Sequence, residues 1–261
     1  MGKYKKKSAA SSLGRTTTRT VNGKQILTMK AAPGIMKQTV ETKKAAKVFG
    51  KASSLEKEFR NTLDAQYAGL FTRETGNEIR GRLNFALHCS RLRLTGGYKF
   101  KRKSLAGLAG TEFNSKSTVR SLLSSLPEVK LKHNVLSVSL SKQVFPAVFK
   151  FPLKTIICEI VVGVSFFRLE DGLKVDLAEM QSMVVNKGAG APIPHTFKFD
   201  VPPGTLCLIS LFLNYSIDNR GGGRLLKDHT FSPGCFCAAI ITPGKYHNSD
   251  QRIWRKSIKL V

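Results

Sequence analysis

Residues 156–167 read IICEIVVGVSFF, and residues 206–217 read LCLISLFLNYSI. Apolar side chains stand at consecutive positions in both stretches, and β-branched and aromatic types dominate. A strand with one solvated face alternates apolar and polar residues, whereas a strand covered on both faces is apolar nearly throughout. The two stretches therefore predict central strands of a sheet that is covered on both sides.

Shorter apolar segments surround these two stretches. Val129 and Leu131 alternate with charged residues, and residues 135–140 follow after a turn at His133-Asn134. The other strand candidates are residues 147–151, 173–177, 183–185, 196–201, 231–242 and 257–261. Turn sequences such as Asp-Gly, Pro-Pro-Gly and Pro-Gly separate them. Short strands with turns about every ten residues indicate an antiparallel β-sandwich or jelly-roll-like domain over residues 128–261.

A helical segment is predicted upstream of these strands, over residues 42–127. Apolar residues there recur at steps of three and four, which is typical of amphipathic helices. We expect a first helix over about residues 42–70, a second from a Thr75-to-Glu78 capping box to Leu94, and a short third over residues 117–126. Helices followed by antiparallel strands make the fold class α+β.

Positive charge is concentrated at the start of the chain. The sequence has 43 Lys and Arg against 17 Asp and Glu, a net charge of +26, and residues 1–51 contain 13 of these cations but only one acid, Glu41. Residues 1–41 carry too few large apolar side chains to offset the entropy lost on ordering. We therefore expect residues 1–41 to form a flexible basic arm, with a hairpin turn at Asn22-Gly23.

Such a polycation attracts phosphate backbones before any specific contact forms. Arginines decorate the second predicted helix, and Tyr98 and Phe100 lie among the lysines that follow it, where aromatic rings would stack on exposed bases. An acidic counterweight is absent from the neighbouring sequence, which favours a binding surface over an ordinary solvated helix face. The predicted nucleic-acid-binding residues are Lys3, Lys5, Lys6, Lys7, Arg15, Arg19, Lys43, Lys44, Lys47, Arg80, Arg82, Arg91, Arg93, Lys101, Arg102 and Lys103.

Catalytic or metal-binding patterns are not visible in the sequence. The acids after residue 150 gather around residues 170–179, a grouping better explained by a solvated hairpin than by acid/base chemistry. Four of the five cysteines lie in apolar runs, as buried thiols of a reducing compartment do, and Cys235-x-Cys237 lacks the usual zinc spacing. We expect a cytoplasmic, non-enzymatic protein without transmembrane segment, signal peptide, metal, cofactor or small-molecule substrate.

Two stretches carry a resemblance to a known family. The first joins residues 21–24 (VNGK) to residues 37–39 (KQT), 42–46 (TKKAA) and 49–53 (FGKAS), and the second is residues 108–114 (LAGTEFN). They resemble an uncharacterised family of basic proteins found in Bacteroidetes-type bacteria, over about half of the chain. Because that family has no established activity, the resemblance implies a similar layout and no site residues.

Three function classes remain. The first is a non-enzymatic protein that binds DNA or RNA backbones largely independently of sequence. The second is a structural β-sandwich subunit of a larger assembly, such as a virus-like shell, whose basic arm points at packaged nucleic acid or a neighbouring subunit. Self-association through the β domain fits both. The third, a binder of anionic membranes, is disfavoured because residues 1–40 lack a strongly apolar helix face.

Overall fold

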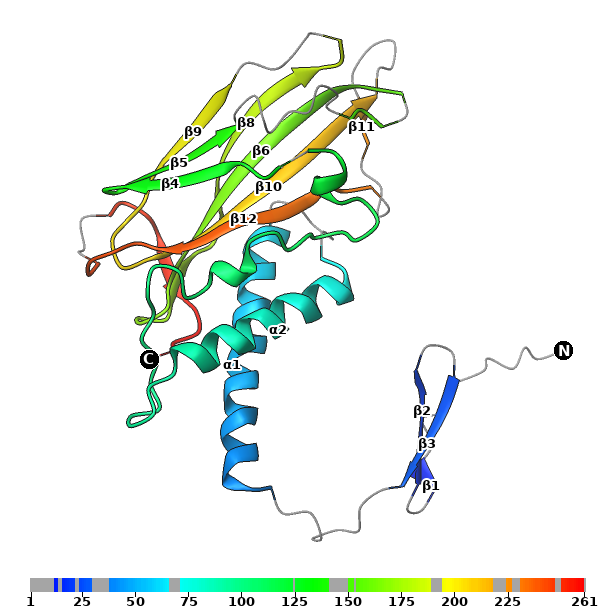
Figure 1. Cartoon of the computed structure of the whole chain (residues 1–261), viewed down its shortest axis with the longest axis vertical. Helices are drawn as coiled ribbons and strands as arrows, with labels where there is room; N and C mark the ends of the chain where they lie inside the picture. Colours follow the sequence, from blue (N-terminus) through cyan, green and yellow to red (C-terminus); the bar gives the residue numbers. More distant parts are fainter. Residues whose placement is uncertain are drawn as a thin grey trace, which may run out of the picture. The chain divides into compact units, whose positions relative to one another are not determined.

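The computed structural model combines helices with antiparallel sheets (Figure 1), so the α+β class expected from the sequence is confirmed. It describes residues 12–13, 16–21, 24–29, 38–65, 71–123, 125–140, 150–152, 154–188, 194–217, 224–226, 231–246 and 250–260. The chain divides into two compact units, Met1–Lys47 and Val48–Val261. Each unit is considered by itself.

The first unit contains a three-stranded antiparallel sheet. Its strands are β1 (Ser12–Leu13), β2 (Thr16–Val21) and β3 (Lys24–Met29), in the order β1-β2-β3. Val21 lies opposite Lys24, as the predicted hairpin requires, although the two turn residues are outside the described part of the chain. The sequence predicted short extended segments only around this turn, and a flexible arm before it, where β1 and most of β2 lie. β2 extends further than predicted because its Thr-rich sequence has a high strand propensity, while the arm's flexibility stays a prediction.

The large sheet of the second unit is built on β6 (Thr155–Arg168) and β10 (Leu206–Ile217), which pair antiparallel along nearly their whole length. β8 (Glu179–Asn186) pairs with the other side of β6, and β12 (Gly234–Ile241) with the other side of β10. The order across the sheet is therefore β8-β6-β10-β12. Shorter pairings at its ends involve β7 (Leu173–Val175), β11 (Arg224–Leu225) and β13 (Trp254–Lys256).

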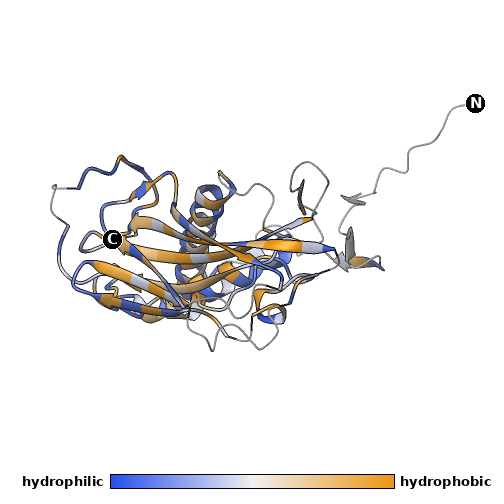
Figure 2. Cartoon of the chain, turned by 90° about the horizontal axis from the view of Figure 1, so that it is seen from above, coloured by the Kyte–Doolittle hydropathy of each residue, from blue (hydrophilic) through white to orange (hydrophobic). Residues whose placement is uncertain are grey.

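A smaller sheet shares a hydrophobic core with one face of the large sheet. It consists of β4 (Glu128–Lys132), β5 (Val135–Leu140) and β9 (His195–Asp200), in the order β4-β5-β9. Val138 and Phe197 of this sheet belong to the same buried cluster as Val162 of β6 and Ile209 of β10. Figure 2 shows the apolar residues running along these strands.

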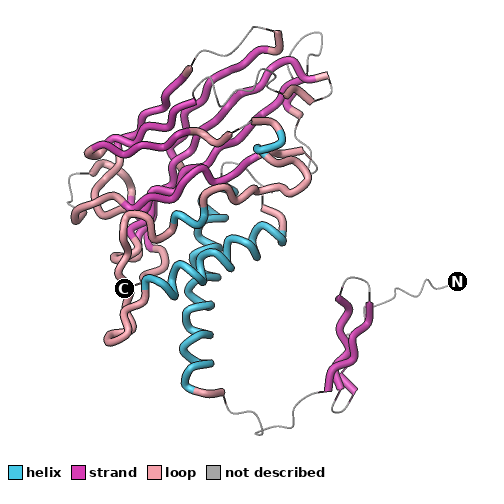
Figure 3. Tube along the Cα trace, viewed as in Figure 1, coloured by secondary structure: helices cyan, strands magenta, loops and turns pink. Residues whose placement is uncertain are grey.

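Two helices cover the opposite face of the large sheet. They are α1 (Val40–Asp64) and α2 (Arg73–Ser90) (Figure 3). Phe59 of α1 and Leu83 of α2 share a buried cluster with Phe212 of β10. Alternate β10 residues thus enter different clusters: Leu206, Leu208 and Phe212 face the helices, and Cys207, Ile209 and Leu211 face the small sheet. The prediction of central strands covered on both faces is confirmed.

Several predicted boundaries are wrong. α2 begins at Arg73, because the Thr72 hydroxyl accepts a hydrogen bond from the Thr75 backbone N–H and caps the helix three residues earlier than expected. It ends at Ser90, since Arg91 pairs back with Tyr98 in an isolated β-bridge, and this leaves Leu94 fully exposed. The expected third helix is only a 3₁₀ turn, Val119–Ser121.

The remaining differences concern the last strands. Residues 257–260 do not form the strand that their apolar pattern predicted; the short strand β13 precedes them, and the Leu260 N–H donates to the Leu169 carbonyl outside any ladder. β11 had no signal in the sequence. Residues 147–149 of another predicted strand lie outside the described part of the chain.

The aromatic contacts between the large sheet and the helical layer generate a stability prediction. Phe236 of β12 is 0% exposed, and its ring meets Phe113 edge-on at 4.7 Å between centroids. Phe236→Ala is expected to lower the free energy of unfolding by about 3–5 kcal/mol, measured by urea denaturation. The control Phe85→Ala removes a ring that is 73% exposed and is expected to change it by less than about 0.5 kcal/mol. Equal effects of the two variants would contradict the packing described here.

Candidate nucleic-acid interface

The cations predicted from the sequence fall into separate groups. Lys3, Lys5, Lys6, Lys7 and Arg15 lie outside the described residues, and Arg19 lies in β2. Lys43, Lys44 and Lys47 are exposed on the first turns of α1, where Lys44 Nζ lies 3.0 Å from Glu41 Oε1. Arg80 and Arg82 belong to α2. Arg91, Arg93, Lys101, Arg102 and Lys103 follow that helix.

Two of the three arginines of α2, Arg80 and Arg82, are bound to carboxylates of their own chain. Arg80 Nη2 lies 3.3 Å from Glu56 Oε2, and its Nη1 donates to Asn77 Oδ1 at 3.0 Å. Arg82 donates to Glu78 Oε1 from Nε at 3.0 Å and from Nη2 at 2.7 Å. The expectation that this helix has no acidic counterweight is therefore wrong. Glu78 lies one turn before Arg82, and Glu56 reaches Arg80 from the other helix.

Glu56 joins the two helices. Its side chain is 3% exposed, and its carboxylate lies 3.6 Å from Arg60 Nε as well as 3.3 Å from Arg80. Gly76 of α2 leaves room for this carboxylate, because a Cβ at that position would lie 3.2 Å from Glu56 Oε1. A buried carboxylate is tolerated only when it is paired and hydrogen-bonded. The pairing thus sets how α2 lies on α1, and with it the start of the chain segment that follows.

That segment, residues 91–103, is called the basic loop below. It carries Arg91, Arg93, Lys99, Lys101, Arg102 and Lys103, and no acid. Five of the six side chains are exposed and Arg91 is half-buried. No ion pair among the described residues involves any of them. The loop therefore presents a cationic surface that the described part of the chain does not neutralise.

Backbone hydrogen bonds hold the basic loop in a defined shape. The Lys99 N–H donates to the Ser90 carbonyl at 2.8 Å, and the Leu92 N–H donates to the Gly97 carbonyl at 2.8 Å. Gly96 turns the chain with a φ of +70°, a conformation that glycine adopts without strain. The cations are thus mounted on an ordered turn, so less conformational entropy is lost when they bind an anion.

The aromatic residues of the basic loop are used inside the protein. Tyr98 is 5% exposed, its ring stacks on Phe100 with centroids 5.9 Å apart, and the Lys51 ammonium lies 4.6 Å from the Tyr98 ring centroid. Phe100 is half-buried against the helical cluster. Base stacking on Tyr98, as predicted from the sequence, is contradicted by this burial. The two rings instead anchor the loop to the core.

Lys51 of α1 lies next to the basic loop. Its Nζ donates to the Leu260 carbonyl at 3.1 Å. Burial, and in second place the positive charge of Arg91, lower the pKa of Lys51 below its usual value. Burial of the Tyr98 side chain raises its own pKa. An anion bound at the loop would offset the repulsion between Lys51 and Arg91.

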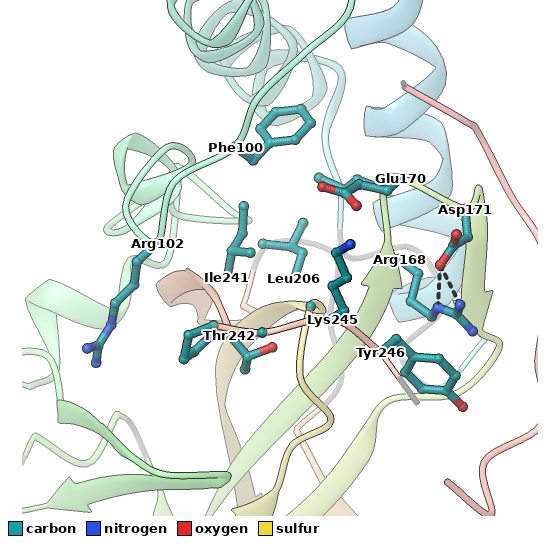
Figure 4. A pocket seen from close by; sticks show the side chains of 14 residues that line it. Phe100, Arg102, Arg168, Glu170, Asp171, Leu206, Ile241, Thr242, Lys245 and Tyr246 are labelled. Atoms are coloured by element: carbon teal, nitrogen blue, oxygen red, sulfur yellow. Dashed lines mark hydrogen bonds and ion pairs between the residues drawn. The ribbon is translucent and has the colours of Figure 1, made fainter. Parts of the chain in front are cut away.

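A cavity of about 510 Å³ lies between the basic loop, the turn after β6 and the chain that follows β12 (Figure 4). Phe100, Leu206 and Ile241 form its apolar part, and Lys245 projects toward it. Arg168 turns aside to form an ion pair with Asp171 and to lie 3.5 Å from the Tyr246 ring centroid. Figure 4 shows Arg102 pointing away from the cavity. The lining also includes Glu170 and Thr242, so the cavity combines apolar, cationic, acidic and hydroxyl groups.

The acids that cluster in sequence after residue 170 bind arginines. Arg168, Arg255 and Arg252 form ion pairs with Asp171, Asp176 and Glu179, respectively. Among the residues that the structure describes, no three His, Cys, Asp or Glu side chains are grouped so as to hold a metal ion. No helix within these same residues is long and apolar enough to span a membrane.

The buried-thiol prediction is confirmed for four of the five cysteines. Cys158, Cys207, Cys235 and Cys237 are buried, whereas Cys89 on α2 is exposed. Burial raises the pKa of Cys158 to about 12 and also raises that of Cys207. Because the thiolate is the reactive form, these buried groups are inert near neutral pH.

Comparison with known proteins yields no match: no family model, curated protein or solved structure is significantly similar to this chain. The resemblance noted in the sequence therefore stays a prediction.

The Glu56 pairing predicts a sensitivity of stability to one carboxylate. Glu56→Gln leaves the partly exposed guanidinium groups of Arg60 and Arg80 without their counterion and is expected to cost about 1.5–3 kcal/mol in urea denaturation. Glu78→Gln removes the exposed partner of Arg82 as a matched control, for which less than about 1 kcal/mol is expected. A loss for Glu56→Gln no larger than the control would refute the proposed link between the helices.

Thiol reactivity follows from burial. In the native protein at pH 8, a thiol-titrating reagent is expected to modify Cys89 alone, and all five cysteines in denaturant. Cys89→Ser should remove the rapid native reaction without changing the folded structure. Rapid reaction of a second thiol in native Cys89→Ser would contradict the burial of the other four.

Proposed function

We propose that this chain is a non-enzymatic protein that binds the phosphate backbone of DNA or RNA, largely independently of base sequence. The observation that carries the proposal is the basic loop, because five of its six cations are exposed and none has a carboxylate partner among the described residues. Opposite charge on the partner is the simplest compensation for such a surface. Backbone contacts by Lys and Arg position a protein on nucleic acid without reading bases.

The mode of binding follows from the kind of groups involved. Each cation that neutralises a phosphate releases condensed counterions, which makes affinity fall steeply with salt. Arg80 and Arg82 contribute little to this surface, because both are bound to carboxylates of the chain. Lys99, which was not among the residues predicted from the sequence, is added to this surface because it is exposed. Lys43, Lys44 and Lys47 on α1, and the lysines near the N-terminus, add further contacts in this proposal.

The second candidate function is a structural subunit of a larger assembly. We interpret the two sheets with their common core as a sandwich, with strands β4, β5 and β9 on one side and β8, β6, β10 and β12 on the other. This order is that of a seven-stranded immunoglobulin-like sandwich whose fourth strand, β8, pairs with the third, β6. The strand order favours this arrangement over the jelly roll. Fold alone does not imply function.

Salt-dependent binding tests the first proposal. The triple variant Lys99→Gln, Lys101→Gln and Lys103→Gln is expected to lower affinity for duplex DNA and to reduce the slope of log K against log salt by up to about 0.9 per lost contact. Binding of the full chain is measured by fluorescence anisotropy between about 50 and 200 mM salt, with single-stranded RNA as a second ligand.

A matched control removes the same charge elsewhere. Lys132→Gln, Lys154→Gln and Lys198→Gln neutralise three exposed lysines in and beside the sheets that form no ion pair among the described residues, and this variant is expected to keep a slope close to that of the wild type. Equal losses in both variants would mean that only net charge matters and would refute the loop as the interface. Salt-independent binding, or binding to anionic vesicles in place of nucleic acid, would overturn the proposed function itself.

A further inference from the structure

Sheet edges carry unpaired backbone N–H and C=O groups that other chains can bind. The outer edge of β12 is covered by the chain that leads into the sheets. The Gly110 N–H donates to the Phe236 carbonyl at 2.7 Å, and the Phe236 N–H donates to the Thr111 carbonyl at 3.0 Å. The Phe113 N–H donates to the Gly234 carbonyl at 2.7 Å. This edge is therefore closed by the protein's own backbone.

The outer edge of β9 is capped by side chains. The Val201 N–H donates to the Asn134 carbonyl, and because alternate residues of an antiparallel ladder exchange bonds, Lys198 and Asp200 point their backbone groups outward. Gln181 Nε2 donates to the Lys198 carbonyl at 2.6 Å, and Arg252 Nη2 donates to the Asp200 carbonyl at 2.6 Å. On β4, the Leu131 carbonyl accepts from Arg102 Nη2 at 3.3 Å.

The outer edge of β8 differs from these three. The Lys187 N–H donates to the Ile156 carbonyl, so the same alternation assigns Met180, Ser182, Val184 and Asn186 to the outer side. None of these four residues has a backbone hydrogen-bond partner on that side within the described part of the chain. The pairing of β8 with β6 shows no register shift.

β8 also lacks the features that usually protect an edge. Its sequence, EMQSMVVN, contains no proline and no lysine, and its only charge is Glu179 at the first position. Val184 is 59% exposed in the middle of the strand. Natural edge strands are normally blocked by lysine, proline, a bulge or a covering segment. An unbulged, nearly uncharged edge is a template for strand addition.

We propose that the outer edge of β8 pairs antiparallel with β8 of a second copy of this chain. When Ser182 faces Val184 of the second copy, the two-fold axis passes beside Met183, and Glu179 of each copy comes opposite Lys187 of the other. Glu179, which also pairs with Arg252 of its own chain, and Lys187, which directly follows the strand, thus bring opposite charges together in this register, which an unrelated partner strand would not share. A two-fold interface of this kind uses the same patch on both copies.

The pairing has a structural consequence. The β8-β6-β10-β12 order continues through the axis into the same four strands of the second copy, which makes one eight-stranded sheet. Each such dimer carries two basic loops, so any ligand long enough to reach both binds with increased effective concentration. The dimer itself does not depend on nucleic-acid binding.

The oligomeric state of the full chain tests the proposal. Sedimentation velocity and native mass spectrometry are carried out without nucleic acid at about 0.5 M salt, where bridging by residual polyanions is suppressed. The wild type is expected at twice the chain mass of 28.7 kDa. Val184→Lys places two like charges close to the axis and is expected to give a monomer. Val135→Lys, on the central strand β5, introduces the same charge at another exposed valine and is expected to stay dimeric.

A second variant separates loss of pairing from loss of folding. Val184→Pro removes an outward N–H and leaves the bonds between β8 and β6 intact, so circular dichroism should be unchanged while the dimer is lost. A monomeric wild type, or a Val184→Lys protein that remains dimeric, would overturn the proposal. A dimer that survives Val184→Lys but dissociates in Leu27→Lys would assign the contact to the exposed strand β3 instead.

Discussion

The antiparallel pairing of β6 with β10 is the constraint on which the rest of the second unit depends. Both strands bury alternate side chains on opposite faces, so the sheet cannot exist without a layer on each side. The small sheet supplies one layer and the helices supply the other. The Met180 side chain of β8 also packs directly over the backbone of Gly163 in β6, where a Cβ would lie 2.6 Å from Met180 Sδ. Glycine at this position therefore allows the side chain to pack there beneath the helical layer.

The position of the cationic surface follows from how the helical layer is held together. Glu56 binds Arg80, and the Tyr98 ring lies between Lys51 and Phe100. These charged and aromatic side chains therefore stabilise the fold and are not available to a ligand. The basic loop, which begins where α2 has ended, keeps six cations that form no ion pair among the described residues. Arg80 and Arg82, the α2 arginines predicted to bind nucleic acid, are instead paired with Glu56 and Glu78.

Local sequence signals predicted the elements that depend on neighbouring residues. The two apolar stretches predicted central strands because a strand buried on both faces has apolar residues at consecutive positions. Turn sequences marked most strand ends. Local signals did not predict structure that depends on contacts with residues distant in the sequence. The expected third helix is only a 3₁₀ turn, whose first N–H groups, those of Val119 and Arg120, donate to the Glu112 carboxylate, and no local pattern announces that bond.

The sequence alone determined the α+β class, the two central strands, the buried thiols and the excess of positive charge, since each depends on composition or on short periodicity. Only the tertiary structure decided which cations stay exposed and which sheet edge stays open. Those outcomes depend on pairs far apart in the chain, such as Glu56 with Arg80, and Gln181 with the carbonyl of Lys198. A charged side chain or a strand edge has the same sequence whether or not the fold brings it a partner.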